Sequence, residues 1–282
     1  MSPKRPRSGT DAALPGAVWL REPRRASRTG PALSRERIVE AAVAALDGGG
    51  VAALSMRKLA DALNVHATSL YWHVPHRDDL LDLALDAVFG EVTLPPAGEA
   101  HTEKAHAGES HAGDPHPGKA HAGESHGGKA PAGEAHATWR ADVALFMREL
   151  RAALLRHPWA AGLAVTRPLM GPNALARAEF VHAALVRAGF DGTALASAAA
   201  LVTQQVTGSV ATQTAWPDGA EDGRARGAFA ERLREAADRY PTLAAHATPA
   251  RSDWDTHFEA GLALLLDGFA AHAARTQPPP GV

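Results

Sequence analysis

The stretch LSMRKLADALNVHATSLYWHVP, residues 54–75, contains two short helical patterns separated by a tight turn. In the first pattern Ser55 is a suitable N-cap, and Leu59 begins an apolar inner face. Asn64, a residue type that tolerates the left-handed conformation, predicts where this helix ends. The second pattern runs to Pro75, because the residue before a proline avoids helical geometry.

The second helix of this stretch has two chemically different faces. Ala67, Leu70 and Val74 share an inner face on a helix of 3.6 residues per turn. The remaining positions carry polar or aromatic side chains: Thr68, Ser69, Tyr71, Trp72 and His73. Such groups can reach base edges and phosphates, although we expect the indole to be partly packed. The alternative is that they only pack and end the helix.

Basic residues open the preceding helix. Ser55, Arg57 and Lys58 lie in its first turn, where free backbone amides attract an anion. Arg57 has the fork geometry for a bidentate contact with guanine. A further helix is expected in LSRERIVEAAVAALDGGG (33–50), capped by Ser34 and ended at Gly48 and its neighbours. Three helices in about 45 residues predict a helix-turn-helix DNA-binding domain.

Charge is divided unevenly along the chain. Residues 1–77 hold 12 Lys and Arg against 6 Asp and Glu, a balance of +6, and the remainder hold 17 against 25, a balance of −8. The basic end is therefore expected to meet a polyanion. The absence of cysteine fits a reducing cytoplasm. No signal peptide or apolar run of about 18 residues is present, so no membrane partner is expected.

The pattern along the chain predicts an all-α protein. Residues 1–32 are interpreted as a disordered basic arm, 33–76 as the helix-turn-helix domain, and 77–92 as an amphipathic linking helix. Residues 138–275 are expected to form a C-terminal helical domain, and 276–282 a tail. Within that domain a long helix over 194–216 has few charges, so it should be buried on most sides, and a charged helix is expected around 225–240.

Residues 93–137 are a low-complexity linker rich in His, Gly, Ala and Pro. Histidines recur every five residues, at His101, His106, His111, His116, His121, His126 and His136. This period does not place ligands on one helix face, so no metal site is expected. A metal-responsive protein with this repeat as its sensor remains the alternative. Two stretches, 113–120 and 123–130, imitate a phosphate-binding loop but lack its Ser/Thr and its strand-to-helix setting, so no cofactor is expected.

The segments LSMRKLADALNV, SLYWHV and DDLLDLAL resemble the DNA-binding domain of the tetracycline-repressor (TetR) family over residues 33–92. VTRP (165–168) and FEAGLALLLDGF (258–269) resemble that family's C-terminal domain. The resemblance implies an all-α homodimer that reads a palindromic double-stranded DNA operator and holds a small-molecule effector. The DNA contacts it implies are Ser55, Arg57, Thr68, Ser69, Tyr71, His73 and Arg77.

The expected ligand differs from that of the tetracycline-resistance repressors themselves. Leu163 and Thr93 stand where those proteins have histidines, and Ala67 replaces a long polar residue, so both ligand and operator should differ. An apolar or aromatic small molecule is expected. The ligand-binding residues predicted are Phe146, Met147, Leu150, Leu163, Thr166, Arg167, Gln204 and Gln205, with Trp159, Phe180 and Trp216 as further lining. Gln204 and Gln205 could instead pair across a dimer.

An enzyme is the remaining class of function. The sequence offers no nucleophile–base pair, no paired carboxylates with room to act and no ordered metal cluster. The prediction is therefore a transcriptional repressor, not an enzyme, that a ligand releases from its operator.

Overall fold

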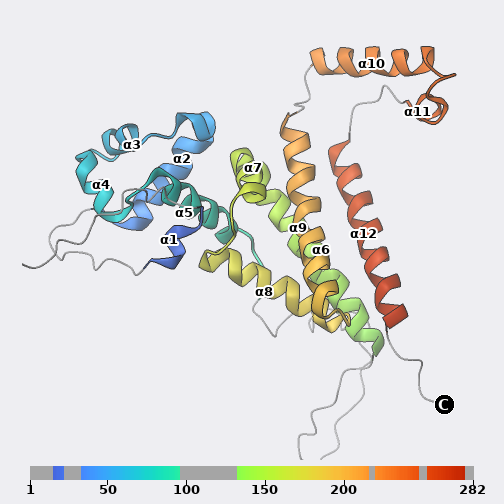
Figure 1. The fold of residues 1–282 in the computed structure, drawn as a ribbon, viewed down its shortest axis with the longest axis horizontal. Helices are drawn as coiled ribbons and strands as arrows, with labels where there is room; N and C mark the ends of the chain where they lie inside the picture. Colours follow the sequence, from blue (N-terminus) through green and yellow to red (C-terminus); the bar gives the residue numbers. More distant parts are fainter. Residues whose placement is uncertain (1–14, 22–32, 96–131, 216–219, 248–252, 277–282) are drawn as a thin grey trace, which may run out of the picture.

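The computed structural model describes residues 15–21, 33–95, 132–215, 220–247 and 253–276, which contain helices and no strand (Figure 1). The all-α prediction is confirmed for these residues. The helices are α1 (Ala17–Leu20), α2 (Arg35–Ala53), α3 (Met56–Ala62), α4 (Ala67–His73), α5 (Arg77–Gly90), α6 (Ala132–Arg156), α7 (Pro158–Thr166), α8 (Pro172–Arg187), α9 (Gly192–Ala215), α10 (Ala220–Glu235), α11 (Pro241–Ala245) and α12 (Trp254–Thr276).

The helix ends of the N-terminal domain follow the capping residues. The Ser34 hydroxyl accepts a hydrogen bond from the Arg37 amide at 3.2 Å, and the Ser55 hydroxyl accepts one from the Lys58 amide at 3.1 Å. Asn64 has a φ of 53°, in the left-handed region, and ends α3 as predicted. The break in α2 lies at Gly50, with a φ of 66°, within the glycine run predicted to end this helix, and helical residues resume after it up to Ala53.

A compact apolar core joins α2 to α5. Ile38, Leu59, Leu70 and Val74 are almost fully buried in it. This burial confirms the inner face predicted for the helix-turn-helix. Helices α3 and α4, of seven residues each, are too short to be stable alone, so this shared core fixes their positions.

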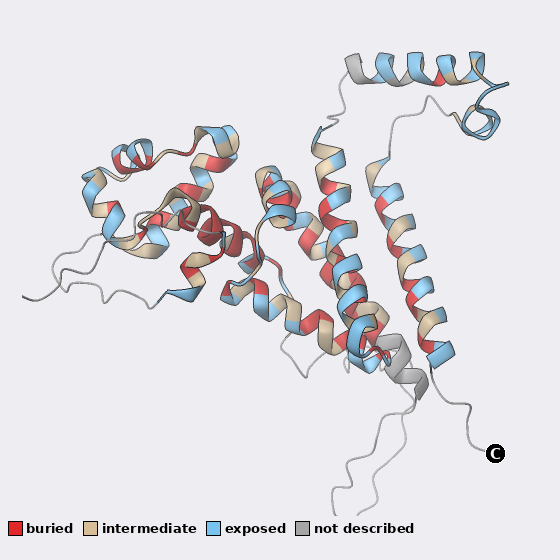
Figure 2. Cartoon of the chain, in the orientation of Figure 1, coloured by how far each residue is buried: buried red, intermediate tan, exposed pale blue. Residues whose placement is uncertain are grey.

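The linking helix α5 differs from the amphipathic helix that we predicted. It is buried on nearly every side (Figure 2), because α1, α2, α6, α7 and α8 all pack against it. Its acidic residues Asp79, Asp82 and Asp86 are buried as well. A helix with this composition can be enclosed only if its carboxylates find partners.

The C-terminal domain surrounds a second core. Helix α6 packs on α8 and α9, and α12 packs on α9 and α6. Trp139, Met147 and Leu154 are fully buried in this core. Helix α6 begins at Ala132, so the domain starts before the predicted boundary at residue 138. Most of the predicted linker, residues 96–131, lies outside the described residues together with its histidines up to His126.

Helix α9 is also different from its prediction. Only one face is buried, through Ala198, Val202 and Val206, while Leu201 is 46% exposed. Helices α10 and α11 contact each other and extend over the ends of α9 and α12 (Figure 1). Helix α10 matches the predicted charged helix, whereas α11 was not predicted.

The predicted disordered arm contains an ordered segment. Residues 15–21 include α1, which packs on α5 with Val18 buried, so the prediction of disorder is wrong for these residues. The rest of the arm, residues 1–14 and 22–32, lies outside the described residues, as does the tail from 277. Within the described ranges, no helix has the length and apolar character to cross a bilayer.

Candidate DNA-binding surface and ligand domain

Helix α4 presents the predicted polar face to solvent. Leu70 and Val74 are fully buried, which turns Thr68 outward and leaves Tyr71 47% exposed. Trp72 is 73% exposed, so the expectation that its indole is partly packed is wrong. An exposed tyrosine and tryptophan side by side on a short helix form a surface that can stack on or donate to a nucleic acid.

The remaining predicted DNA contacts surround this face. Arg57 and Lys58 are exposed in the first turn of α3, and Ser69 and His73 are half-buried on α4. The pKa of Glu36 is lowered, first by the hydrogen bond from its own backbone amide and then by the Ser34 hydroxyl, with smaller contributions from the charges of Arg35 and His73.

Arg77 lies at this surface but has structural partners. Its Nε donates to the Leu54 carbonyl at 3.0 Å, and its Nη2 donates to the Val51 carbonyl. Both carbonyls follow the kink at Gly50, and the Val51 carbonyl also accepts the Leu54 amide at 3.4 Å. The guanidinium thus holds the α2–α3 turn against the start of α5.

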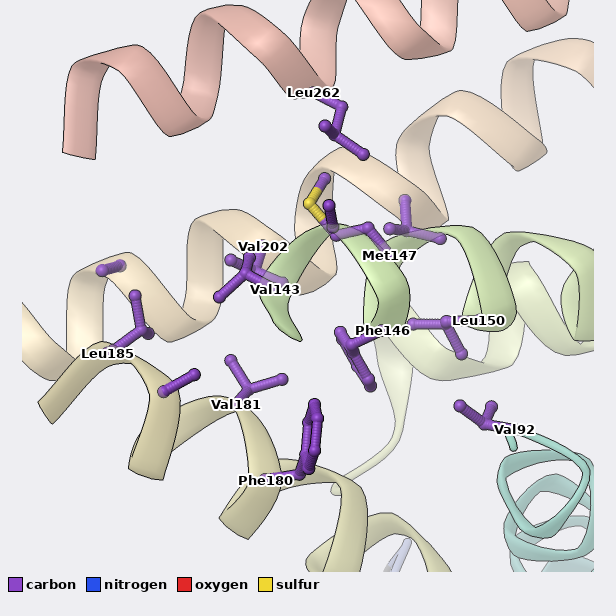
Figure 3. Packing of buried hydrophobic residues seen from close by; sticks show 14 of the residues in the cluster. Val92, Val143, Phe146, Met147, Leu150, Phe180, Val181, Leu185, Val202 and Leu262 are labelled. Atoms are coloured by element: carbon purple, nitrogen blue, oxygen red, sulfur yellow. The ribbon is translucent and has the colours of Figure 1, made fainter. Parts of the chain in front are cut away.

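The apolar residues predicted to bind ligand gather in the C-terminal core. Phe146, Met147 and Leu150 on α6 are buried, and so is Phe180 on α8. Figure 3 shows Phe146 and Phe180 directed into the interior between these helices. Leu163 and Trp159 on α7 are half-buried and pack against both the N-terminal and the C-terminal core. Trp216 lies outside the described residues.

The polar residues predicted for the ligand site are not brought together. Arg167 donates to Asp82 at 2.7 Å and to Asp78 at 2.6 Å, and only 10% of its side chain is exposed. Burial lowers the pKa of Arg167, but the hydrogen bonds to these two carboxylates outweigh burial and raise it. The exposed Thr166 hydroxyl donates to backbone carbonyls of its own helix, including that of Gly162.

The two glutamines point to different surroundings. Gln204 lies on the exposed side of α9, and Gln205 is half-buried. A Cβ added at Gly261 of α12 would lie 2.5 Å from the Gln205 Nε2 atom, so that amide rests against the α12 backbone. Gln205 therefore belongs to the packing between α9 and α12.

Three buried carboxylates on α5 were missed by the sequence analysis. Asp79 pairs with Arg21 at 2.6 Å, and Asp82 pairs with Arg167. Asp86 accepts from the Ala174 amide at 2.9 Å and from the Asn173 side chain at 3.1 Å, so it caps the N-terminus of α8. The spacing 79, 82 and 86 places them on one helix face, which was the available signal.

A second polar contact joins the domains at the other end of α5. The ring of His157, just before α7, lies between Asp47 of α2 and Glu91 after α5, with N–O distances of 2.7 and 3.0 Å. The Trp159 indole also donates to Asp47 at 2.7 Å. Asp47 lies in α2 just before its kink and Glu91 is the C-cap of α5, and nothing in their local sequence predicts this meeting.

Two family models match the chain. One, described as bacterial regulatory proteins of the tetR family, matches residues 38–84, and the other, the tetracyclin repressor-like C-terminal domain, matches residues 130–273. An HTH-type transcriptional regulator of Saccharopolyspora erythraea is 46% identical over 267 residues, which are 95% of this chain and 97% of the relative. The HTH-type transcriptional repressor DrrR1 of Streptomyces coeruleorubidus is 29% identical over 87% of this chain and 80% of its own length.

Among solved structures, the TetR family protein ActR of Streptomyces coelicolor, in complex with actinorhodin, is similar. It superposes with a TM-score of 0.62 and 30% identity over 86% of this chain and 98% of ActR. The matches cover both the helix-turn-helix and the C-terminal helices, in the order in which the structure arranges them. The chain therefore belongs to the TetR family of helix-turn-helix transcriptional regulators.

Proposed function

We propose that this regulator is a cytoplasmic homodimeric repressor that an apolar or aromatic small molecule releases from a palindromic DNA operator. The observation that carries the proposal is the outer face of α4, where Tyr71 and Trp72 are exposed while Leu70 and Val74 are fully buried. Burial on one side fixes the orientation of the helix, and the exposed side offers groups suited to a major groove.

The DNA contacts that we propose are residues whose hydrogen-bond donors are free to reach DNA. Arg57 and Lys58 are exposed, and Thr68 and Tyr71 share the outer face of α4 with Ser69 and His73 beside them. The backbone amide of Lys58 is already bonded to the hydroxyl of Ser55, so Ser55 acts first as a cap. We assign Arg77 an indirect role, because its guanidinium holds the turn that positions α3.

The effector is proposed to enter the C-terminal core. Phe146, Met147, Leu150 and Phe180 supply apolar and aromatic surface there. ActR, a similar protein, has been solved in complex with actinorhodin, which supports a bound effector for this chain as well. A 100-fold loss of affinity for DNA requires the effector to favour the released conformation by about 2.7 kcal/mol.

Dimerisation is proposed through α9 and α12, which lie side by side (Figure 1). Each exposes an apolar side chain: Leu201 is 46% exposed and Leu264 is 74% exposed. A charge at Leu201 should dissociate the dimer, which sedimentation can measure. Leu175 on α8 is 54% exposed, so Leu175→Glu is the matched control for Leu201→Glu. Equal effects of the two variants would contradict this interface.

Fluorescence anisotropy tests the DNA-binding proposal, with the DNA upstream of the chain's own gene and with fragments selected from random sequence. We expect salt-sensitive binding, weakened by about 1–3 kcal/mol in Arg57→Ala and Tyr71→Ala. The chain has two tyrosines, and Tyr240 on the far side of the molecule is 41% exposed, so Tyr240→Ala is the matched control. No enrichment of any sequence would refute the proposal.

A further inference from the structure

The short N-terminal segment 15–21 lies where the two domains meet. Helix α1 packs against α5, and Val18 is buried in the N-terminal core. On its other side, Gly16 approaches the loop that follows α7. A Cβ at Gly16 would lie 2.8 Å from Pro168 Cγ and 3.4 Å from Met170 Sδ. The segment therefore touches the linking helix and the C-terminal domain at once.

The carboxylate of Asp82 is shared between these two neighbours. Its Oδ2 accepts from the Gly16 amide at 2.7 Å, and its Oδ1 accepts from Arg167 Nη1, also at 2.7 Å. The side chain of Asp82 is only 1% exposed, so water does not replace either donor. Removing one donor would leave the other to neutralise the buried charge alone.

An ion pair attaches the other end of the segment to α5. Arg21 Nη1 donates to Asp79 Oδ2 at 2.6 Å, and the Asp79 side chain has no exposed surface. Its Oδ1 atom has no hydrogen-bond partner among the described residues. Arg21 therefore supplies the ion-pair partner that this buried carboxylate requires.

We propose that residues 15–21 are a positioning strut that holds the 167–170 loop of the C-terminal domain against α5. Gly16 suits the strut because its φ is +82° and its approach to Pro168 leaves no room for a side chain. The strut sets the angle between the domains, and through it the separation of the two recognition helices in a dimer. Only this last step rests on the proposed function.

Hydrogen exchange in the full-length chain tests the strut. We compare Gly16→Ala, which strains the backbone and meets Pro168, and Arg21→Gln, which removes the ion pair, with wild type. Leu20→Ala is the control, because Leu20 lies in the same segment and is 76% exposed. Exchange is measured at the amides of Arg167 and Met170, which donate to the carbonyls of Leu163 and Pro168. It is also measured along α12, which packs on α9 and α6 and away from α1.

Both strut variants should speed exchange at residues 167–170 by about 10-fold, while α12 and the Leu20→Ala control keep wild-type rates. Unchanged exchange at 167–170 would overturn the strut. Equal acceleration in α12 would also overturn it, because the segment would then contribute only general stability. Anisotropy on the same samples separates the two proposals: wild type that binds no DNA refutes the proposed function, while the exchange result stands by itself.

Discussion

Replacing Arg167 by alanine should cost far more stability than replacing an exposed arginine that also forms hydrogen bonds with a carboxylate. Arg167 is 10% exposed and bonds Asp82, which is 1% exposed, and Asp78, which is 45% exposed. Loss of one partner from a buried pair costs about 3–5 kcal/mol, because an uncompensated charge remains. The bond to the exposed Asp78 should contribute less than about 1 kcal/mol of this.

The matched control is Arg148, which forms two hydrogen bonds with Glu259 at 2.8 and 2.6 Å. Both partners are about half exposed, at 52% and 47%, so Arg148→Ala should cost less than about 1 kcal/mol. Urea unfolding followed by circular dichroism measures both variants. All samples are kept at one protein concentration, since the proposed dimerisation would make stability concentration-dependent.

A double-mutant cycle then assigns the effect to its partner. Arg167 with Asp82 should show a coupling free energy of about 1.5–3 kcal/mol, and Arg167 with Asp78 less than about 1 kcal/mol. Equal costs for Arg167→Ala and Arg148→Ala would refute the reasoning. Arg167 would then be free for the role in ligand binding that the sequence suggested.

Two further outcomes follow from Asp86 and its surroundings. Gly171→Ala should destabilise the fold by about 1–3 kcal/mol in urea unfolding, because a Cβ at Gly171 would lie 2.2 Å from the Asp86 carboxyl carbon. Gly162→Ala is the control, because a Cβ at Gly162 would meet nothing within 4 Å. Burial raises the pKa of Asp86 against the opposing hydrogen bonds of Ala174 and Asn173. Its contribution to stability is therefore present below the ordinary pKa of an aspartate and lost as pH rises through the raised value. The stability difference between wild type and Asp86→Asn should fall over that range, and a rise would show that the hydrogen bonds dominate.

The helix-turn-helix could be predicted closely because its signals are local. Ser34, Ser55 and Asn64 act within a few residues of the helix ends that they set, and the 3.6-residue period placed Leu70 and Val74 inside. The segment at residues 15–21 could not be predicted, because its order depends on carboxylates more than fifty residues away. Composition alone made it resemble a solvated arm.

The burial predicted for α5 and for α9 was wrong for a similar reason. Charges on α5 suggested a solvent-exposed face, yet Asp79, Asp82 and Asp86 meet donors from three distant segments. The apolar composition of α9 suggested burial on most sides, yet the subunit alone covers one face. The period of apolar residues shows which faces a helix has, but not which other elements pack against each face. For α5 those elements come from distant parts of the chain, and for α9 we propose that they come from a second subunit.

Because α5 lies in both cores, it is the element through which the proposed effector would act on the DNA-binding domain. Helix α5 contributes Leu81 and Ala84 to the N-terminal core, and Leu85 and Val88 to the C-terminal core, so neither core can shift without it. The buried carboxylates of α5 resist small displacements, because each needs a donor at hydrogen-bond distance and intermediate positions leave a charge unpaired. We therefore expect the interface to adopt discrete arrangements, in which a small change near α7 would become an all-or-none change in the position of α4.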